Sequence, residues 1–277
     1  MRPFSLLLLL LLVGLAGWLV WKKLPPEPKP RIPNPPTDPP PPPHDSLSVY
    51  YPRSTHACQI VVHTYYALCY DEEHEQPRWT VHLLEGQRLK AGRVRRTQDF
   101  RPDPQVASAS AQLADYRGSG YDRGHLVPAG DFKWDSLGMS ETFFLSNMSP
   151  QLHEFNAGIW EAVERTVREW AKQKGRLVVY TGPVLDRIQG KIGASRVSIP
   201  RAFYKILYSA AGNETKAVAF LVPHASSKRP PTDFLVSVDS VERLTQIDFY
   251  PALPDAIEEL AESRVDKRFW LAGAKRH

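Results

Sequence analysis

A dense run of prolines near the N-terminus constrains the fold more than any other feature of this sequence. Twelve of the 26 prolines fall within residues 25–43. Proline fixes φ and has no backbone N–H, so such a run can enter neither a helix interior nor the middle of a sheet. It predicts an extended linker over residues 24–44, which in the polyproline II conformation could reach roughly 60 Å at about 3.1 Å per residue. A ligand for a domain of the SH3 type is the alternative interpretation.

The segment before the linker is apolar. Residues 3–21 contain no charged side chain, and Lys22 and Lys23 close the run. A helix of this length is about 28 Å long, which matches the hydrocarbon core of a bilayer. Residues 1–23 are therefore predicted to form an N-terminal transmembrane helix that anchors a domain outside the cytoplasm, in the periplasm or at the cell surface. The alternatives are a cleaved signal peptide, which implies secretion, and an anchor in an organelle membrane.

Residues 45–277 are interpreted as one α+β domain. Runs rich in β-branched and aromatic residues predict strands, at residues 59–63, 65–70, 78–84, 176–180, 203–208 and 217–222. Apolar residues at spacings of four, four and three predict a helix over residues 159–172. Residues 241–247 are expected to begin a shorter helix.

The chain has two cysteines, Cys58 and Cys69. They lie near the ends of two adjacent predicted strands, where a hairpin would bring them together. An export segment and an even number of cysteines favour a disulfide between them. Two free buried thiols are the alternative.

The most informative pattern lies in residues 116–164. Within it, Asp122-Arg123-Gly124-His125 is interpreted as a strand, in which successive side chains alternate between two faces. Arg123 and His125 then share one face, and Asp122 points to the other. An arginine beside an imidazole suits phosphate chemistry, because its guanidinium binds two phosphoryl oxygens and its charge favours a neutral histidine that can accept a proton. Gly124 is expected to let a substrate or the backbone approach closely. For so short a motif, an ordinary surface pair is the alternative.

Asn156 stands at the start of the predicted helix. Asparagine is a common helix N-cap, but its amide oxygen is also a reasonable ligand for Mg²⁺, which keeps several waters and needs few protein ligands. Asn156, Trp160 and Glu164 follow at intervals of four and would lie along one helix face. Because eight helical residues rise by about 12 Å, Glu164 is expected to orient a water on the metal rather than to bind the ion directly.

Four ordered motifs resemble the DNA/RNA non-specific endonuclease family, the ββα-metal nucleases. They are DRGH at residues 122–125, LSNMSPQ at residues 145–151, Asn156 with Trp160 four positions later, and Glu164. Residues 181–183, 199–205 and 238–254 are also similar, so the resemblance covers residues 60–254. It departs at Gln246, where the family often has glycine.

The resemblance implies an α+β fold with a central antiparallel sheet flanked by helices, here preceded by the anchor. It also implies a Mg²⁺-dependent endonuclease, with Mn²⁺ as an alternative ion, that cleaves DNA, RNA or both to 5′-phosphate and 3′-hydroxyl ends. His125 would be the general base, Asn156 the metal ligand, and Arg123 a contact to the phosphate.

Other residues would support this site. The resemblance calls for an upstream phosphate-binding arginine, and Arg96 is our choice for it, with Arg95 and Arg101 as rivals. Residues predicted to be structural near the site are Asp122, Gly124 and Asn147.

Bulk charge adds little to this interpretation. The formal net charge is +5, but residues 1–43 hold five basic and two acidic side chains, which leaves +2 for the rest. A basic groove for a polyanion must therefore be a local cluster. Two other functions stay open: a non-catalytic nucleic-acid-binding or surface protein on a nuclease fold, and a phosphodiesterase for small or lipid substrates. The sequence also leaves a homodimer open.

Overall fold

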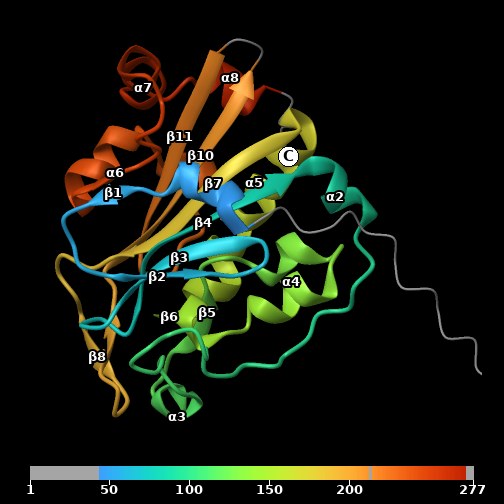
Figure 1. Ribbon diagram of the computed structural model, residues 1–277. Coiled ribbons are helices and arrows are strands. Elements are labelled where there is room, and N and C mark those ends of the chain that lie inside the picture. The colour runs from blue at the N-terminus through green and yellow to red at the C-terminus, as the bar shows by residue number, and fades with distance from the viewer. Residues whose placement is uncertain (1–43, 212–213, 273–277) are drawn as a thin grey trace, which may run out of the picture. The chain divides into compact units, whose positions relative to one another are not determined.

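A seven-stranded antiparallel sheet forms the centre of the folded part (Figure 1). The structure is a computed structural model that describes residues 44–211 and 214–272. The strands, in spatial order, are β12 (Leu235–Val236), β11 (Glu214–Pro223), β10 (Ala202–Ala211), β7 (Arg176–Val184), β4 (Gln76–Glu85), β3 (Tyr66–Asp71) and β2 (Gln59–Val62). Every neighbouring pair is antiparallel, and β10 and β11 form the longest ladder, from Ala202↔Pro223 to Ala211↔Glu214.

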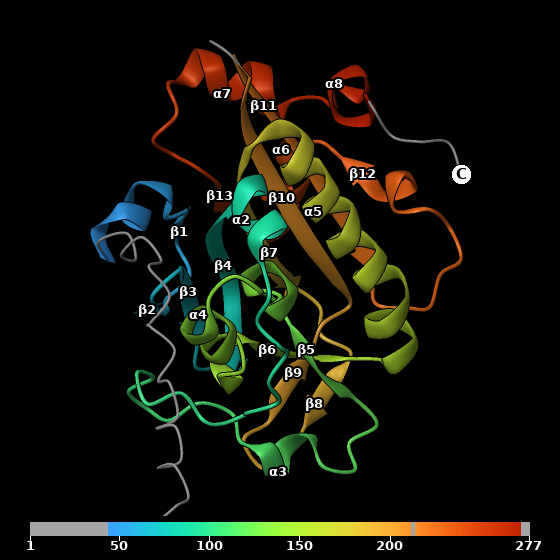
Figure 2. The same ribbon diagram turned by 90° about the vertical axis from the view of Figure 1, so that its right-hand side faces the viewer.

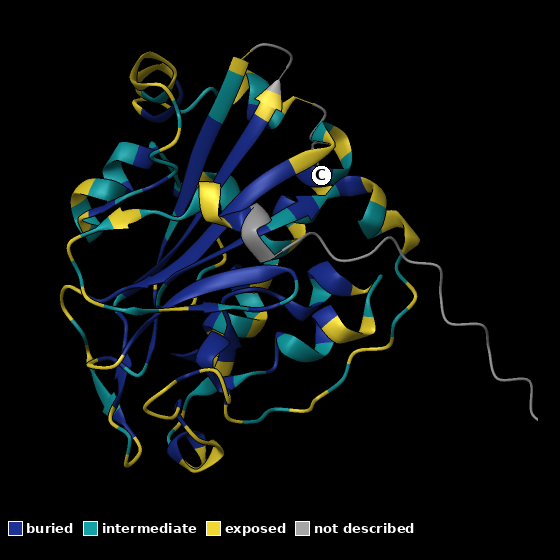
Figure 3. Cartoon of the chain, in the orientation of Figure 1, coloured by how far each residue is buried: buried dark blue, intermediate teal, exposed yellow. Residues whose placement is uncertain are grey.

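Side chains on each strand alternate between the two faces of the sheet, and both faces are buried in hydrophobic cores. One core holds Tyr180 and Tyr204 under α6 (Val238–Thr245) and α7 (Asp255–Glu262). The opposite core holds Phe203 and Phe220 under α5 (Glu161–Lys174) (Figure 2). Figure 3 shows the same pattern, with buried strands at the centre and exposed residues on the outer helices and loops. Burial of each such aromatic side chain contributes roughly 1.5–3 kcal/mol of transfer free energy.

Short elements surround the sheet. Three two-stranded sheets are β1 (Arg53–Ser54) with β13 (Ile247–Asp248), β5 (Asp122–His125) with β6 (Met148–Gln151), and β8 (Gly190–Ile192) with β9 (Val197–Ile199). The remaining helices are η1 (His44–Tyr50), α2 (Gly86–Ala91), α3 (Leu113–Tyr116), η2 (Ala129–Phe132), α4 (Ser136–Glu141), η3 (Leu145–Asn147), η4 (Phe155–Trp160), η5 (Pro231–Phe234) and α8 (Lys267–Leu271). Along the chain, β5, β6 and α5 form a strand–strand–helix unit, which leads directly into the candidate site.

The predicted α+β class and central antiparallel sheet are confirmed. Each predicted strand is present. Four of them are longer than the sequence pattern indicated by three or four residues, whereas the strand predicted at residues 59–63 ends one residue earlier. The disulfide between Cys58 and Cys69 is present and joins the ends of the β2–β3 hairpin, in which Ile60 is paired with Cys69.

The prediction for residues 241–247 was wrong in its bounds. Helix α6 begins at Val238, ends at Thr245, and is followed by strand β13 from Ile247. The helix stops because Gln246 adopts a left-handed conformation, with φ of 57°. Glycine is the usual residue at this position of a helix end. The left-handed backbone therefore explains why the family often has glycine where this chain has Gln246.

The predicted anchor and linker, residues 1–23 and 24–44, lie almost wholly outside the described residues. Within residues 44–211 and 214–272, no helix is both long and apolar enough to cross a bilayer. The division into anchor, linker and a domain over residues 45–277 therefore stays a prediction.

A buried carboxyl under α7 predicts a pH-dependent stability. Glu262 is 1% exposed and accepts a hydrogen bond from the Tyr208 hydroxyl. Burial is the largest cause that raises its pKa to about 9, and the negative charges of Glu242 and Glu258 add to the effect. The folded chain therefore keeps a proton that the unfolded chain, with a pKa of 4.5, releases. Stability from this group is complete below pH 4.5 and is lost as the pH rises through about 9.

We predict that Glu262→Gln stabilises the fold at pH 8, because the amide stays neutral in both states. The gain in unfolding free energy should exceed the gain at pH 4 by at least about 1 kcal/mol, roughly the worth of one pKa unit. Denaturant unfolding at the two pH values measures it. If the substitution changed the unfolding free energy by the same amount at pH 8 and at pH 4, Glu262 would be ionised in the folded state.

Candidate active site

A cleft of about 720 Å³ opens where β5, the start of α5 and the loop after α2 meet. In Figure 2, β5 lies between the lower end of α5 and α3. The walls of the cleft are formed mainly by polar, charged and aromatic side chains, with four small or aliphatic residues among them. The lining residues are Arg96, Phe100, Leu113, Tyr116, Arg117, Tyr121, Asp122, Arg123, His125, Pro128, Ala129, Asn156, Ala157, Glu161 and Glu164. The structure thus brings together the predicted site residues His125, Asn156, Glu164, Arg123 and Arg96, although they come from four separate segments.

His125 ends strand β5 and is 8% exposed. Its ring stands edge-on to Phe143, with 4.8 Å between ring centroids, and its buried Nε2 has no hydrogen-bond partner among the described residues. Burial, followed by the positive charges of Arg96 and Arg123, lowers the pKa of His125 to about 3. The imidazole is therefore neutral at physiological pH, with a nitrogen free to accept a proton.

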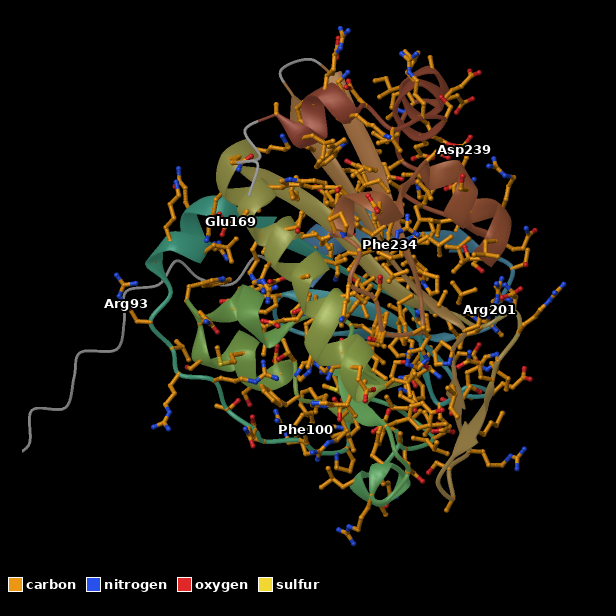
Figure 4. All side chains as sticks on the ribbon, turned by 180° about the vertical axis from the view of Figure 1, so that it is seen from behind. Arg93, Phe100, Glu169, Arg201, Phe234 and Asp239 are labelled. Carbon is orange, nitrogen blue, oxygen red and sulfur yellow. A yellow bond between two sulfur atoms is a disulfide. The ribbon has the colours of Figure 1, made fainter. Side chains whose placement is uncertain are left out.

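Two arginines supply positive charge without a carboxylate partner. Within the described residues, neither Arg96 nor Arg123 forms an ion pair; instead the Arg96 guanidinium lies 5.1 Å from the centroid of Phe143, and that of Arg123 lies 4.1 Å from the centroid of Phe100. Figure 4 shows Phe100 on the loop that passes the lower part of the molecule. Glu164 lies near enough to Arg96 to act on its charge, but because neither guanidinium is held in an ion pair, both can bind an anion in the cleft.

The rival arginines are placed differently. Arg101 pairs with Asp99 at 2.7 Å and also donates to the backbone oxygen of Ser140, so it anchors the loop. Arg95 is not among the lining residues of the cleft. Of the three, Arg96 alone faces the cleft, although its role in binding phosphate stays a prediction.

Asn156 has a fixed amide orientation. Its Nδ2 donates to Oδ2 of Asp122 at 2.9 Å, and the same oxygen lies 2.9 Å from Nδ1 of His153. Since a carboxylate only accepts hydrogen bonds, the amide nitrogen must face Asp122, which leaves the carbonyl oxygen of Asn156 for another partner.

The backbone around Asn156 departs from the expected helix. Residues 155–160 form the π-helical segment η4, and Gly158 interrupts it with φ of −108° and ψ of −106°. This kink corrects the prediction that Asn156, Trp160 and Glu164 share one helix face. Trp160 is fully buried in the core, whereas Asn156 and Glu164 both line the cleft. Short π-helical insertions occur frequently at functional sites, but nothing in the sequence predicted this one.

Glu164 lies deeper in the cleft, with 15% of its side chain exposed. Burial raises its pKa to about 7, although the charges of Lys205 and Arg168 oppose the increase. Nη1 of Arg168 is 3.7 Å from Glu164 and 3.1 Å from Asp131. Sequence reasoning missed this charge network, which restrains Glu164.

Two expectations about the DRGH strand were wrong. Asp122 does not point away from the site, because the cleft extends past the start of the short strand β5 and Asp122 there contacts Asn156. Gly124 makes room for a neighbouring side chain rather than for a substrate: an added Cβ would lie 2.1 Å from the Gln151 amide carbon. Asn147 is fully buried and bonds both the N–H and the carbonyl of Val127, which holds the backbone just after His125.

The Asn156 side of the cleft offers oxygen ligands. Besides the free carbonyl oxygen of Asn156, the carboxylates of Asp122, Glu161 and Glu164 line the same space. Among the described residues, three acidic ligand atoms converge only at Asp239, Glu242 and Glu262, apart from the cleft. A metal in the cleft would therefore have few protein ligands, all of them oxygen, which is the arrangement that Mg²⁺ prefers.

Comparison with known proteins relates the chain to nucleases. The family model for DNA/RNA non-specific endonucleases matches residues 45–256. Over 200 residues the chain is 37% identical to human mitochondrial endonuclease G, a match that covers 67% of each protein. It is 35% identical over 208 residues to human mitochondrial nuclease EXOG, covering 69% of this chain and 56% of the relative.

Two further similarities extend beyond vertebrates and to a solved structure. The chain is 34% identical over 204 residues to nuclease C1 of Cunninghamella echinulata var. echinulata, covering 68% of this chain and 81% of the relative. A crystal structure of the EndoG/EndoGI complex, which concerns the mechanism of EndoG inhibition, superposes with a TM-score of 0.68 at 29% identity and covers 76% of this chain and 92% of that one.

Proposed function

This chain belongs to the DNA/RNA non-specific endonuclease family, and from that membership and the geometry of its cleft we propose that it is a divalent-metal-dependent endonuclease with His125 as the general base. One observation carries the proposal: a neutral, buried histidine with an unpartnered nitrogen lines a cleft that also contains a free amide oxygen and two arginines that form no ion pair within the described residues. General bases, phosphate ligands and a metal ligand are the groups that phosphodiester hydrolysis requires.

His125 takes a proton from a water molecule, and the resulting hydroxide attacks phosphorus. The bond from phosphorus to the 3′ oxygen breaks, and the leaving oxygen takes a proton from solvent in the open cleft. The products carry a 5′-phosphate and a 3′-hydroxyl. A bound phosphate raises the low pKa of His125 by adding negative charge near the ring, so the base works closer to the ambient pH, where it is most effective.

Arg123 and Arg96 hold the phosphate. Their guanidinium groups match phosphoryl oxygens in pairs, and stacking on Phe100 and Phe143 keeps them in place. Their charge also keeps His125 deprotonated. The same two side chains therefore bind the substrate and maintain the base.

Asn156 would hold a divalent cation through its carbonyl oxygen, and we favour Mg²⁺, with Mn²⁺ as an alternative. A bound cation supplies positive charge that stabilises the phosphate oxygens in the transition state. Asp122 fixes the orientation of the Asn156 amide. Glu164, behind Asn156, orients water in the same part of the cleft.

The arrangement favours an enzyme over the two alternatives. A non-catalytic binding protein on a nuclease fold does not require a buried histidine with a free nitrogen. In this chain the histidine, the amide of Asn156 and the two arginines all line one cleft. A substrate with one phosphodiester, such as a lipid, would need fewer cationic groups than the cleft contains.

We further propose that the N-terminal apolar segment anchors the enzyme with its domain outside the cytoplasm, and that the proline linker spaces it from the membrane. An organelle membrane is the alternative, and several relatives, including human endonuclease G and EXOG, are named as mitochondrial. A disulfide in the folded domain is in keeping with a compartment that permits oxidation.

Product analysis tests the proposed reaction. Cleavage of a DNA and an RNA oligonucleotide in ¹⁸O-water should place one labelled oxygen in each new 5′-phosphate and leave the 3′ ends as unlabelled hydroxyls. Mass spectrometry of the fragments measures both. Terminal 3′-phosphates or cyclic phosphates would contradict the mechanism, and binding without turnover would support the non-catalytic alternative.

A further inference from the structure

One end of the cleft lies beyond the residues that the proposed mechanism uses. It is formed by α3 and the residues after it, and it contributes Leu113, Tyr116 and Arg117 to the cleft wall. We call these three residues the α3 rim. In Figure 2, α3 lies below β5, on the side away from α5.

The α3 rim is held rigidly despite the shortness of the helix. The Asp115 carboxylate accepts hydrogen bonds from the backbone N–H of Gln112 at 2.7 Å and of Ser195 at 2.9 Å. Gly193 packs directly on Asp115, where an added Cβ would lie 2.3 Å from its carboxylate. The segment that bears Arg117 is therefore fixed to the turn between β8 and β9, not a free loop.

Arg117 is exposed and forms no ion pair within the described part of the chain. Some other surface arginines are paired with an acid: Arg201 lies 2.9 Å from Asp186, and Arg229 lies 3.1 Å from Asp233. An arginine that faces a cleft without an acidic neighbour favours an anionic ligand there.

A second polar group of the α3 rim also lacks a partner. Tyr116 is 6% exposed, and its buried hydroxyl has no hydrogen-bond partner among the described residues. Leaving such a group unsatisfied is unfavourable, so a donor kept unpaired beside a cleft points to a ligand or ordered water. Leu113 adds apolar surface, since it is 38% exposed.

The size of the cleft leaves room for more than one phosphate. Its volume of about 720 Å³ lies within the range of pockets that enclose drug-sized ligands. His125, Asn156, Arg96 and Arg123 account for a single phosphodiester, and Arg117 is a further cation outside that set.

We propose that the α3 rim is a subsite for the phosphodiester next to the one that is cleaved, with Arg117 binding that neighbouring phosphate and Leu113 contacting the attached nucleotide. This inference rests on the proposed nuclease function. It makes the enzyme selective for chains with at least two consecutive phosphodiesters.

The test combines a protein substitution with a substrate substitution. The substrates are short oligonucleotides with one cleavable phosphodiester, flanked on one side by a phosphate or by an uncharged methylphosphonate. For the wild-type chain, the methylphosphonate on the side bound by the α3 rim should lower kcat/KM by about tenfold or more, the usual worth of a hydrogen bond to a charged group. For Arg117→Ala, the phosphate substrate should show the same loss, and the methylphosphonate should cause less than about a twofold further change.

The matched control is Arg264→Ala. Arg264 is exposed, forms no ion pair within the described residues, and follows α7 at the opposite end of the molecule from α3 (Figure 1). The Arg264→Ala substitution removes the same charge from the chain, but the variant should still prefer the phosphate substrate over the methylphosphonate. Arg117→Lys should keep part of the preference, because the charge remains while the paired donors are lost.

Two outcomes would overturn the subsite. One is a methylphosphonate effect that stays unchanged in Arg117→Ala; the other is an equal loss of affinity in Arg117→Ala and Arg264→Ala, which would indicate general electrostatic attraction only. Hydrolysis of bis(p-nitrophenyl) phosphate, which has one phosphodiester, should be the same in all variants. Absence of that hydrolysis, with no oligonucleotide cleavage, would instead refute the nuclease function itself.

Discussion

His125→Ala is expected to lower kcat by at least about three orders of magnitude, within the upper range for loss of a general base. The reason is that no other described residue in the cleft presents an unpartnered neutral nitrogen beside the arginines. Single-turnover cleavage of a labelled oligonucleotide measures the chemical step without interference from product release. The KM for the substrate should change little, because Arg96 and Arg123 still bind the phosphate. Imidazole added to the mutant should restore part of the rate.

The stability of this variant serves as its control. The folded-state pKa of His125 is about 3, against 6.5 in the unfolded chain, with burial as the main cause. As the pH falls from 6.5 to 3, His125 becomes protonated in the unfolded wild type but stays neutral in the folded state. The free energy of unfolding of the wild type therefore decreases over that interval. The mutant lacks this loss and should become more stable relative to wild type as the pH decreases. Near-normal cleavage by a folded His125→Ala variant would remove His125 from the mechanism.

Asn156→Ala is expected to abolish metal-dependent activity and to weaken Mg²⁺ or Mn²⁺ binding. The loss of affinity should exceed the roughly ten- to hundredfold cost of removing a group that only supports a ligand, because few other oxygen ligands face the cation. Isothermal titration calorimetry with each ion measures it. Raising the Mg²⁺ concentration should not restore normal kcat, since the charge is no longer held beside the phosphate.

His153→Ala is the matched control for this substitution. His153 contacts the same Asp122 oxygen as Asn156 does, but it is exposed and offers the cleft no oxygen. Its removal should change metal affinity by less than about threefold, a surface-scale effect. If metal binds Asn156→Ala as tightly as wild type, the ligand lies elsewhere.

Sequence patterns predicted the parts of this fold that depend on local periodicity. Strands such as residues 176–180 follow from apolar runs, and the DRGH strand from its short alternating motif. The positions of His125 and Asn156 followed from motif spacing. These features could be predicted because each depends on a few residues that are neighbours in the sequence.

Contacts between distant segments were not predictable in the same way. The network of Arg168, Asp131 and Glu164 joins helix α5 to the segment after β5, and no local pattern marks it. The π-helical kink at Gly158 changes which residues share a face. Phe100 and Arg117 lie in stretches without periodicity, so only the tertiary structure assigns them to the cleft.

Cleavage of supercoiled plasmid by the full-length chain tests the central claim most directly. With Mg²⁺, the account predicts relaxed circles followed by linear DNA, because an endonuclease cuts internal phosphodiesters. With EDTA it predicts no product, and excess Mg²⁺ added afterwards should restore cleavage. Plasmid that is bound without being cut, or cut equally well in EDTA, would contradict a metal-dependent endonuclease.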